Sequence, residues 1–329
     1  MSGSGETSDD FSKRVTKIVD DHFLAISMNV GHKLGLFDTL HDTAAEKSPK
    51  TSEEVAKAAN CKERYVREWL RAMVAANIVE CDASGAKFWL PEHRFKAVTS
   101  KGNSPLFLVS LSMALTETQD FVFDCFKAEN PRKGISYEEF TRFHPLMERA
   151  SSQRFRKELI PIFVPSVPGL QASLESGIKV LDAAKNANPP LPSNLSYEVM
   201  DAVKLKQDWT EHFDYVTTFD SVHDQARPDL ALLEVYRVLK KGGRYSMVDV
   251  EGTSDAKKDR DLAFVNFKYA ASINHCLPVS LYFDGGMGLG TMWGVETAKR
   301  MLNETGFKEV KVLPKMNPAD INLHYLCTK

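Results

Sequence analysis

The stretch FDYVTTFDSVHDQARPDLALLEVYRVLKKGGRYSMVDV, residues 213–250, decides the fold class of this chain. Its first part, Phe213–Phe219, is an apolar run with the length of a buried strand, and it leads into polar residues. A helix-spaced segment follows, with Pro228 at its start and the glycine pair at Gly242 at its end. The run RYSMVDV then reads as another strand. Strand, helix and strand in this order predict a βα unit of an α/β sheet.

The same alternation extends on both sides of this stretch. Upstream, GIKVLD at residues 177–182 predicts a short buried strand that ends in Asp182. Downstream, VETAKRMLNETGF predicts a helix closed by Gly306, and residues 308–314 and 322–328 predict a final pair of strands. We therefore expect residues 171–329 to form a Rossmann-like α/β domain with a C-terminal antiparallel hairpin.

The first part of the chain has a different pattern. Residues 1–14 are polar and predict a disordered tail. Thr51 and Glu54 form a capping box at the start of a short helix, and a second helix spans about residues 62–77. Two short strands follow it, joined by the turn DASG. Helix, turn, helix and hairpin predict a winged-helix domain over residues 15–99.

A winged helix raises the hypothesis of DNA binding, which the charge opposes. Residues 51–98 contain eight Lys and Arg against seven Asp and Glu, and the second helix carries Glu63 and Glu68 beside its arginines. Such a balance is a poor match for phosphate groups. We expect a packing or dimerisation domain instead, with nucleic acid as the weaker alternative. Residues 100–170 are mainly helical and predict a connector between the two domains.

Composition limits the remaining classes of protein. The chain has 329 residues, a net charge of −2 and 43% apolar residues, which is ordinary for a soluble protein with two domains. Its five cysteines are scattered, without a C-x-x-C pair, so we expect a reducing compartment and no metal site. No apolar run approaches 18 residues and the N-terminus is acidic, so we expect neither a membrane span nor a leader peptide. The cytoplasm is the expected location, with the nucleus as the alternative.

The chain resembles the class I S-adenosylmethionine-dependent methyltransferases, in the branch with an N-terminal winged-helix dimerisation domain. The segments that carry the resemblance span most of the chain from about residue 20, and they are RYVREWLRAMVAANIVE, VLDA, VMDAV, FDYVTTFDSVHDQARPDL, RVLKKGGRYSMVDV, NHCLPVSL, GLGTMWG and NETGFKEVKV. The resemblance implies S-adenosylmethionine as cofactor, no metal, a small-molecule methyl acceptor and a homodimer formed through the N-terminal domain.

The resemblance also implies roles for particular residues. His223 and Asp224 match a pair in which the histidine is the general base for a hydroxyl acceptor. The expected substrate-site residues are Tyr137, His144, His275 and Trp293. By resemblance, the first two belong to helices within residues 100–170 that roof the substrate site. The expected cofactor-site residues are Asp182, Asp201, Ala202, Phe219 and Asp220. Packing is the alternative for His223, for the helical residues Tyr137 and His144, and for the neighbouring pair His275 and Cys276.

The segment after Asp182 departs from the family pattern. The family places a glycine-rich turn there, then a second strand ending in an acid that holds the ribose. Here only the 18 residues 183–200 separate Asp182 from Asp201, whereas two βαβ units that share a strand need about 60 residues. Pro189, Pro190 and Pro192 also prevent a helix through the gap. We expect the domain to be truncated between 183 and 196.

Two hypotheses of function follow. In the first, the chain is a small-molecule methyltransferase that acts on an oxygen, nitrogen or sulfur nucleophile, with His223 as base when the acceptor is oxygen. In the second, it is a non-catalytic homologue that dimerises or regulates by binding, because the truncation removes most of the cofactor site. A DNA-binding regulator is the third and weakest hypothesis.

Overall fold

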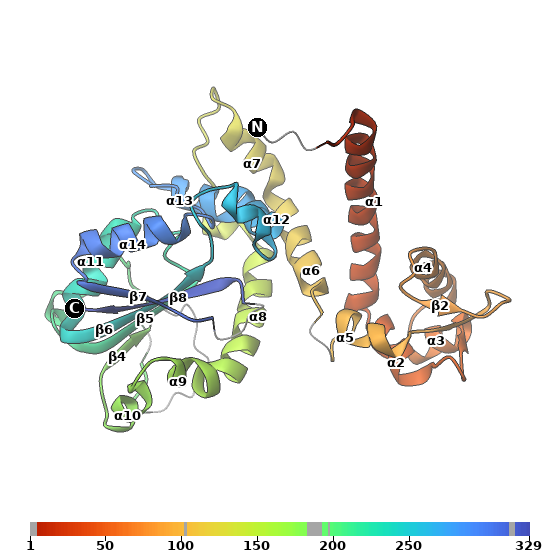
Figure 1. Ribbon diagram of the computed structural model, residues 1–329, viewed down its shortest axis with the longest axis horizontal. Helices are drawn as coiled ribbons and strands as arrows, with labels where there is room; N and C mark the ends of the chain where they lie inside the picture. The colour runs from red at the N-terminus through yellow and green to blue at the C-terminus, as the bar shows by residue number, and fades with distance from the viewer. Residues whose placement is uncertain (1–4, 102–103, 183–192, 197, 316–319) are drawn as a thin grey trace. The chain divides into compact units, whose positions relative to one another are not determined.

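The computed structural model describes residues 5–101, 104–182, 193–196, 198–315 and 320–329 (Figure 1). The chain divides into two compact units, Met1–Met113 and Ala114–Lys329. The division falls inside the predicted connector at 100–170, and most of the predicted truncation between 183 and 196 lies outside the described residues.

The first unit is a winged helix preceded by a long helix. Its elements are α1 (Ser8–Lys33), α2 (Leu36–Thr43), β1 (Lys50–Thr51), α3 (Ser52–Ala58), α4 (Glu63–Ala75), β2 (Glu80–Cys81), β3 (Lys87–Trp89), η1 (Glu92–Arg94), α5 (Phe95–Val98) and α6 (Leu106–Leu115), the last of which crosses into the second unit. The three short strands pair antiparallel in the order β1-β3-β2, so β2 and β3 form the predicted hairpin.

Local sequence signals explain the helices of this unit. The Thr51 hydroxyl accepts a hydrogen bond from the Glu54 backbone N–H, and the Glu54 carboxylate accepts one from the Thr51 N–H, as the capping box predicts. Val66, Leu70 and Met73 bury one face of α4 in the core of the unit. Helix α1 begins at Ser8, earlier than the predicted tail allows, because Thr7 and Asp10 form a second capping box.

The second unit contains the α/β sheet. Its helices and strands are α7 (Gln119–Phe126), α8 (Phe143–Glu158), α9 (Val164–Ser166), α10 (Leu170–Glu175), β4 (Val180–Asp182), β5 (Phe213–Phe219), α11 (Pro228–Val238), β6 (Leu239–Val250), α12 (Val265–Ala271), α13 (Leu277–Tyr282), α14 (Gly294–Thr305), β7 (Glu309–Leu313) and β8 (Asn322–Thr328). Short 3₁₀ helices are η2 (Thr116–Thr118), η3 (Tyr137–Glu139), η5 (Gln207–Trp209) and η6 (Lys258–Asp261), and π-helical turns are η4 (Leu159–Phe163) and η7 (Ser272–Cys276).

The strand order is β4-β5-β6-β8-β7. The first three strands are parallel, and β8 inserts antiparallel between β6 and β7, which confirms the predicted C-terminal hairpin. Strand β4 lies at the edge of this sheet and pairs only with β5 among the described strands. The carboxyl ends of β4, β5 and β6 therefore point to the same side, where ligands bind in open α/β sheets.

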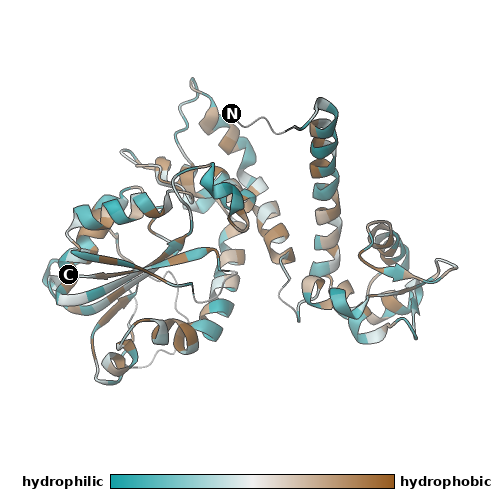
Figure 2. Ribbon diagram, in the orientation of Figure 1, coloured by the Kyte–Doolittle hydropathy of each residue, from teal (hydrophilic) through white to brown (hydrophobic). Residues whose placement is uncertain are grey.

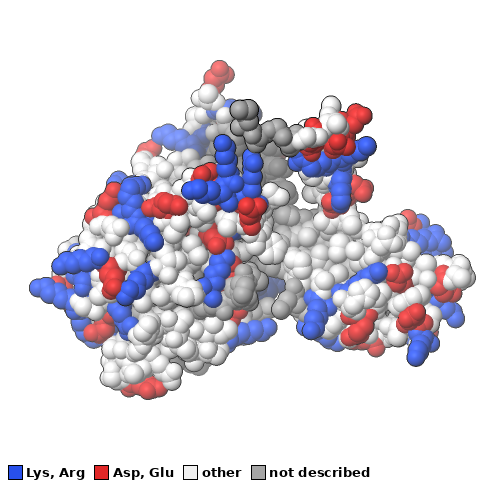
Figure 3. Space-filling model, in the orientation of Figure 1, with Lys and Arg blue, Asp and Glu red and all other residues white. Residues whose placement is uncertain are grey.

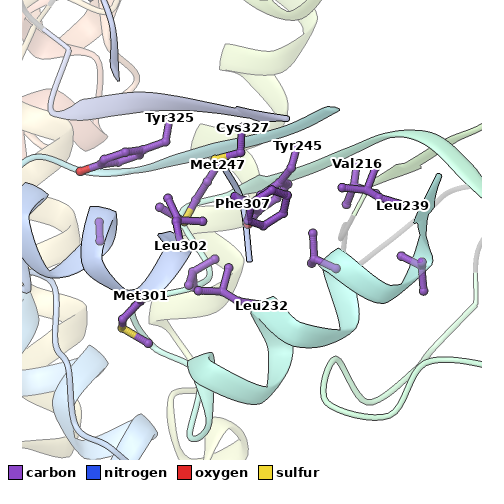
Figure 4. Packing of buried hydrophobic residues seen from close by; sticks show 14 of the residues in the cluster. Val216, Leu232, Leu239, Tyr245, Met247, Met301, Leu302, Phe307, Tyr325 and Cys327 are labelled. Carbon is purple, nitrogen blue, oxygen red and sulfur yellow. The ribbon is translucent and has the colours of Figure 1, made fainter. Parts of the chain in front are cut away.

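Both faces of the sheet are covered. On one face, Leu232 of α11 and Met301 and Leu302 of α14 pack against strand residues such as Met247 and Tyr325 (Figure 4). Figure 2 shows that the outer turns of α11 and α14 are hydrophilic, as expected for helices with one buried face. On the other face, residues of η4, α9 and α10 pack against β5, β6 and β8.

The boundary between α11 and β6 differs from the prediction. We expected the helix to continue to Gly242, but α11 ends at Val238 and the strand begins at Leu239. Gly242 adopts a left-handed φ of 74°, and its N–H donates to the carbonyl of Lys329, so the glycines form an irregular start of the strand. The register of β5 against β6 shifts at the same place.

One helical stretch has the length and composition of a membrane span. Residues Leu106–Phe126 meet these criteria, and 39% of the tested window is buried inside the protein. Core helices of soluble proteins meet the same criteria, so the absence of a membrane span stays a prediction.

Candidate functional site

A buried histidine–carboxylate pair lies where β5 and β6 end. His223 follows β5, and Asp249 is the second-last residue of the neighbouring parallel strand β6. The Nδ1 atom of His223 lies 2.6 Å from Oδ1 of Asp249, and the two residues are 4% and 0% exposed. The other carboxylate oxygen of Asp249 accepts the backbone N–H of Val222. Asp249 therefore fixes both the ring of His223 and the loop that carries it.

This environment favours the protonated form of His223. Burial lowers the pKa of His223, but the neighbouring Asp249 and Cys276 outweigh burial, and the pKa is raised well above its ordinary value. With Nδ1 directed at Asp249, the Nε2 atom is the one that can exchange a proton with another group.

The group at Nε2 is the thiol of Cys276. Its Sγ atom lies 3.3 Å from Nε2 of His223, and it accepts a hydrogen bond of 3.0 Å from the Thr291 hydroxyl. Cys276 ends the π-helical turn η7 and is 7% exposed. His275, the preceding residue, places its Nδ1 atom 3.6 Å from the same sulfur. The base is therefore in contact with a nucleophilic side chain of the same protein.

The predicted substrate residues gather beside this pair, with one exception. The Tyr137 hydroxyl donates to Asp224 over 2.8 Å, and the Tyr137 ring stacks on His144 at 4.6 Å between ring centres. Nε2 of His144 lies 3.2 Å from Nε2 of His275. Burial, followed by the negative charge of Asp224, raises the pKa of Tyr137, so this phenol is neutral and donates. Trp293, in contrast, packs in the apolar core.

The predicted cofactor residues are brought together only in part. Asp182 ends β4 and accepts a 2.5 Å hydrogen bond from the Thr217 hydroxyl on β5. The ring of Phe219 packs edge-on against Phe155 and Phe163, with ring centres 5.0 Å apart in both pairs. Asp220 has a left-handed φ of 47°, and burial and then Asp249 raise its pKa to about 6.

Asp201 and Ala202 lie in the loop before β5. Asp201 is exposed, and its carboxylate accepts the N–H of Val203 in a local turn. No hydrogen bond given for the described residues joins Asp201 to Asp182 or Phe219. Asp201, one of the expected cofactor-site residues, is therefore not held against the strand ends by such a contact.

These residues do not fit the cradle that S-adenosylmethionine needs. The sequence has no glycine from residue 178 to residue 241, so the segment after Asp182 has no residue type that lets the backbone approach a cofactor closely. Among the described residues, no strand pairs with the outer side of β4 and supplies an acid for the ribose. One carboxylate oxygen of Asp182 accepts a hydrogen bond from the Thr217 hydroxyl.

The described residues contain no group of three or more His, Cys, Asp or Glu that could hold a metal ion. An open surface hollow lies elsewhere in the second unit. Its lining includes none of the predicted site residues and consists of Asn130, Pro131, Arg132, Lys133, Gly134, Ser136, Glu139 and Tyr282. The polar cluster around His223 is therefore the best candidate for a functional site.

Two of its members, Asp249 and Thr291, were not predicted, and Cys276 was considered only together with its neighbour His275. Asp249 had a usable signal, because it lies near the end of the parallel strand beside the one that leads to His223. No comparable signal predicts the contact of Cys276 and Thr291 with His223, because that contact depends on how η7 and the loop before α14 pack.

Comparison with known proteins gives two family matches. Residues 22–100 match a family described as an Rv2258c-like winged HTH domain, and residues 176–306 match a family described as a methyltransferase domain. No curated protein matches the sequence.

Solved structures similar to this chain cover nearly all of it. Human N-acetylserotonin methyltransferase in complex with S-adenosylmethionine has a TM-score of 0.63 and 16% identity, covering 100% of this chain and 99% of that one. PigF with S-adenosylhomocysteine has a TM-score of 0.58, 15% identity and coverages of 98% and 99%. An O-methyltransferase family protein from Burkholderia thailandensis has a TM-score of 0.61, 12% identity and coverages of 97% and 98%. At these identities the likeness establishes the fold.

Proposed function

Because this chain is a methyltransferase-family protein in which a winged helix-turn-helix domain precedes the methyltransferase domain, we propose that it keeps the acceptor half of the family's site and lacks most of the cofactor half. One contrast carries the proposal. The histidine–carboxylate pair of His223 and Asp249 is hydrogen-bonded and buried. In contrast, the chain has no glycine between residues 178 and 241 to form the cofactor turn.

The acceptor half suits a small molecule with a hydroxyl group. A histidine whose Nδ1 faces a buried carboxylate presents Nε2 to the acceptor. The neutral ring takes a hydroxyl proton at Nε2, and the protonated ring that the raised pKa favours donates a hydrogen bond to the acceptor oxygen. Tyr137, His144 and His275 supply hydrogen-bonding groups and aromatic surface beside it. In this proposal the protein binds such a compound and acts as a non-catalytic homologue of the methyltransferases.

Binding of S-adenosylmethionine is expected to be weak. Each charge-assisted hydrogen bond that is not made costs about 1.5–3 kcal/mol, and about 1.4 kcal/mol corresponds to a tenfold change in affinity. The loss of the close backbone contacts and of the ribose acid therefore moves an ordinary micromolar site to about millimolar or weaker.

Isothermal titration tests this proposal on the full chain. S-adenosylmethionine and S-adenosylhomocysteine are titrated separately into protein that shows a cooperative thermal melt. We expect no saturable heat below about millimolar ligand. A micromolar dissociation constant would overturn the proposal. The enzyme hypothesis would then stand, and acceptors would be screened with His223→Ala as the inactive control.

We also propose that the protein is a homodimer through its N-terminal domain. Helix α1 exposes a run of large apolar side chains at Phe11, Val15, Ile18, Val19 and Phe23, each between 44% and 62% exposed. Such a surface is unusual for a helix in contact only with water. Sedimentation velocity should give a dimer, which Ile18→Asp dissociates and the matched change Lys13→Asp does not. A monomeric wild-type protein would contradict this proposal.

Nucleic-acid binding is less well supported. Arg64 pairs with Glu68 and Arg67 with Glu63 along α4, so these cations are partly neutralised on their own helix. Figure 3 shows Lys and Arg interspersed with Asp and Glu on the visible face of the first unit. A location in the cytoplasm, or alternatively the nucleus, stays a prediction.

A further inference from the structure

Cys276 is a nucleophilic group that the proposed function does not use. We propose that Cys276 is an activated thiol, with His223 as its base and Asp249 orienting that base, and that it adds to small uncharged α,β-unsaturated carbonyl compounds. The proposal does not depend on binding of S-adenosylmethionine or of a methyl acceptor.

The geometry is that of a nucleophile, a base and an orienting acid. Sγ of Cys276 lies 3.3 Å from Nε2 of His223, and Nδ1 of the same ring lies 2.6 Å from Asp249. Activated cysteines are recognised by such a base within hydrogen-bond reach, itself held by a third group. The Thr291 hydroxyl donates to the sulfur over 3.0 Å and stabilises negative charge there.

The three residues come from separate parts of the second unit. His223 lies after β5, Asp249 lies on β6, and Cys276 lies in the π-helical turn η7. Packing of η7 alone does not require a thiol in contact with Nε2 of His223, the ring nitrogen that does not face Asp249. A structural cysteine in the same unit, Cys327, makes no such contact, and burial raises its pKa to about 12.

A chain of polar side chains leads away from the sulfur. Nδ1 of His275 lies 3.6 Å from Sγ, and Nε2 of His275 lies 3.2 Å from Nε2 of His144, which is only half-buried. This series of contacts offers a route for protons between the site and its surroundings. The titratable groups around Cys276 and His223 are Asp249, Asp220, Asp224, Tyr137, His275 and His144.

The burial of the site selects the electrophile. Cys276 is 7% exposed, so a charged or bulky compound would lose too much solvation to reach it. In the resting site, the thiol proton of Cys276 lies on Nε2 of His223, in keeping with the raised pKa of this histidine. In the reaction, Sγ of the thiolate forms a bond to the β-carbon. The π electrons of the C=C bond move toward the carbonyl as an enolate, and the proton returns from His223 to the α-carbon. No leaving group, oxidant or reductant is needed.

Acrylamide is a suitable probe, because it is small, uncharged and α,β-unsaturated. The native protein is treated with acrylamide near pH 7, and the adduct at each cysteine is followed by peptide mass spectrometry over time. We expect Cys276 to react at least about tenfold faster than Cys327, and Cys276→Ser to lose that adduct only. His223→Gln should slow Cys276 about tenfold while the half-buried Cys61 keeps its rate.

Two results would overturn the proposal. One is a Cys276 that stays as unreactive as Cys327 in the native protein, while urea-unfolded protein labels at all cysteines. The other is an unchanged Cys276 rate in a His223→Gln protein with a normal melt. If that variant does not fold, the pH profile of the wild type decides. An ordinary thiol loses about tenfold in rate per pH unit below its pKa, so a Cys276 profile as steep as that of Cys61 contradicts the proposal and a nearly flat one supports it.

Discussion

The end of β4 and the ends of β5 and β6 belong to one side of the same sheet, but they are packed very differently. At β5 and β6, the paired residues His223 and Asp249 are almost completely buried and share hydrogen bonds. At β4, Val180 is 40% exposed, and the Asp182 side chain has one hydrogen-bond partner among the described residues, Thr217. The difference is what we expect if the proposed function is correct, because that proposal assigns the proton-transferring residues to the ends of β5 and β6 and a weakened cofactor site to the end of β4.

The largest difference in the free energy of unfolding is expected between two single variants, one that removes the acid on β6 and one that removes the acid on β4. Asp249→Ala leaves the His223 ring and the Val222 N–H buried without their acceptor, so we expect a loss of about 3–5 kcal/mol in the free energy of unfolding. Asp182→Ala removes one hydrogen bond at an edge and should cost about 1 kcal/mol. Urea unfolding of both variants measures this, and equal losses would remove the distinction between the two regions.

A second test uses the sign of a pH dependence. The pKa of Asp220 is raised to about 6, first by burial and then by Asp249. Between about pH 4 and pH 6 the folded protein therefore holds a proton that the unfolded chain releases, and stability falls as the pH rises through this range. Asp220→Asn cannot ionise, so it should gain about 1–3 kcal/mol at pH 7.5 and little at pH 4.

The matched control for this test is Asp214→Asn. A hydrogen bond from Lys240 lowers the pKa of Asp214, so its stabilising contribution is present above the unfolded pKa and is lost as the pH falls. Asp214→Asn should therefore weaken the protein at pH 7.5. A higher free energy of unfolding for Asp214→Asn at pH 7.5, or a lower one for Asp220→Asn, would contradict the expected destabilisation by the buried, ionised Asp220.

A smaller difference is expected between two valines on adjacent strands. Val216 of β5 is 1% exposed, so Val216→Ala should cost about 2 kcal/mol through lost apolar burial. Val180 of β4 is 40% exposed, and Val180→Ala should cost less than about 0.5 kcal/mol. Thermal unfolding of the pair measures both. A Val180→Ala loss as large as that of Val216→Ala would mean that β4 is covered in solution.

The smallest effect concerns local opening. Amide hydrogens of β4 should exchange at least about tenfold faster than those of β6, because an edge strand opens without unfolding the sheet. Hydrogen exchange followed by mass spectrometry tests this on the wild-type protein. Equal protection in the two strands would place β4 in the same cooperative unit as the interior of the sheet.

The sequence predicted those parts of the fold that depend on near neighbours. The capping box of Thr51 and Glu54, the buried run of β5 and the final strand pair are determined by residue types a few positions apart. Helix α1 begins at Ser8, inside the segment whose polar composition predicts a tail, and Thr7 and Asp10 carry the same kind of local signal as Thr51 and Glu54.

The candidate site was harder to predict because its contacts join distant segments. His223 and Asp224 were identified by resemblance, whereas Asp249 lies 26 positions from His223 and Cys276 lies 53. These residues lie close together because of the order of the strands and the π-helical turn. The spacing of apolar residues along the sequence predicts neither feature. Trp293 was expected at the substrate site by resemblance, and its side chain packs in the apolar core.

The place of β8 in the strand order has a consequence for how the protein folds. Strand β6 gains its second neighbour only when Asn322–Thr328 arrives, whereas β5 is joined to it through a single short helix. Pairing between segments far apart in the chain is slow, because the loop that it closes is long. During that delay β6 presents an unpaired edge to other molecules. The yield of refolded protein should therefore fall with concentration, and the rate at which β8 inserts should set how steeply it falls.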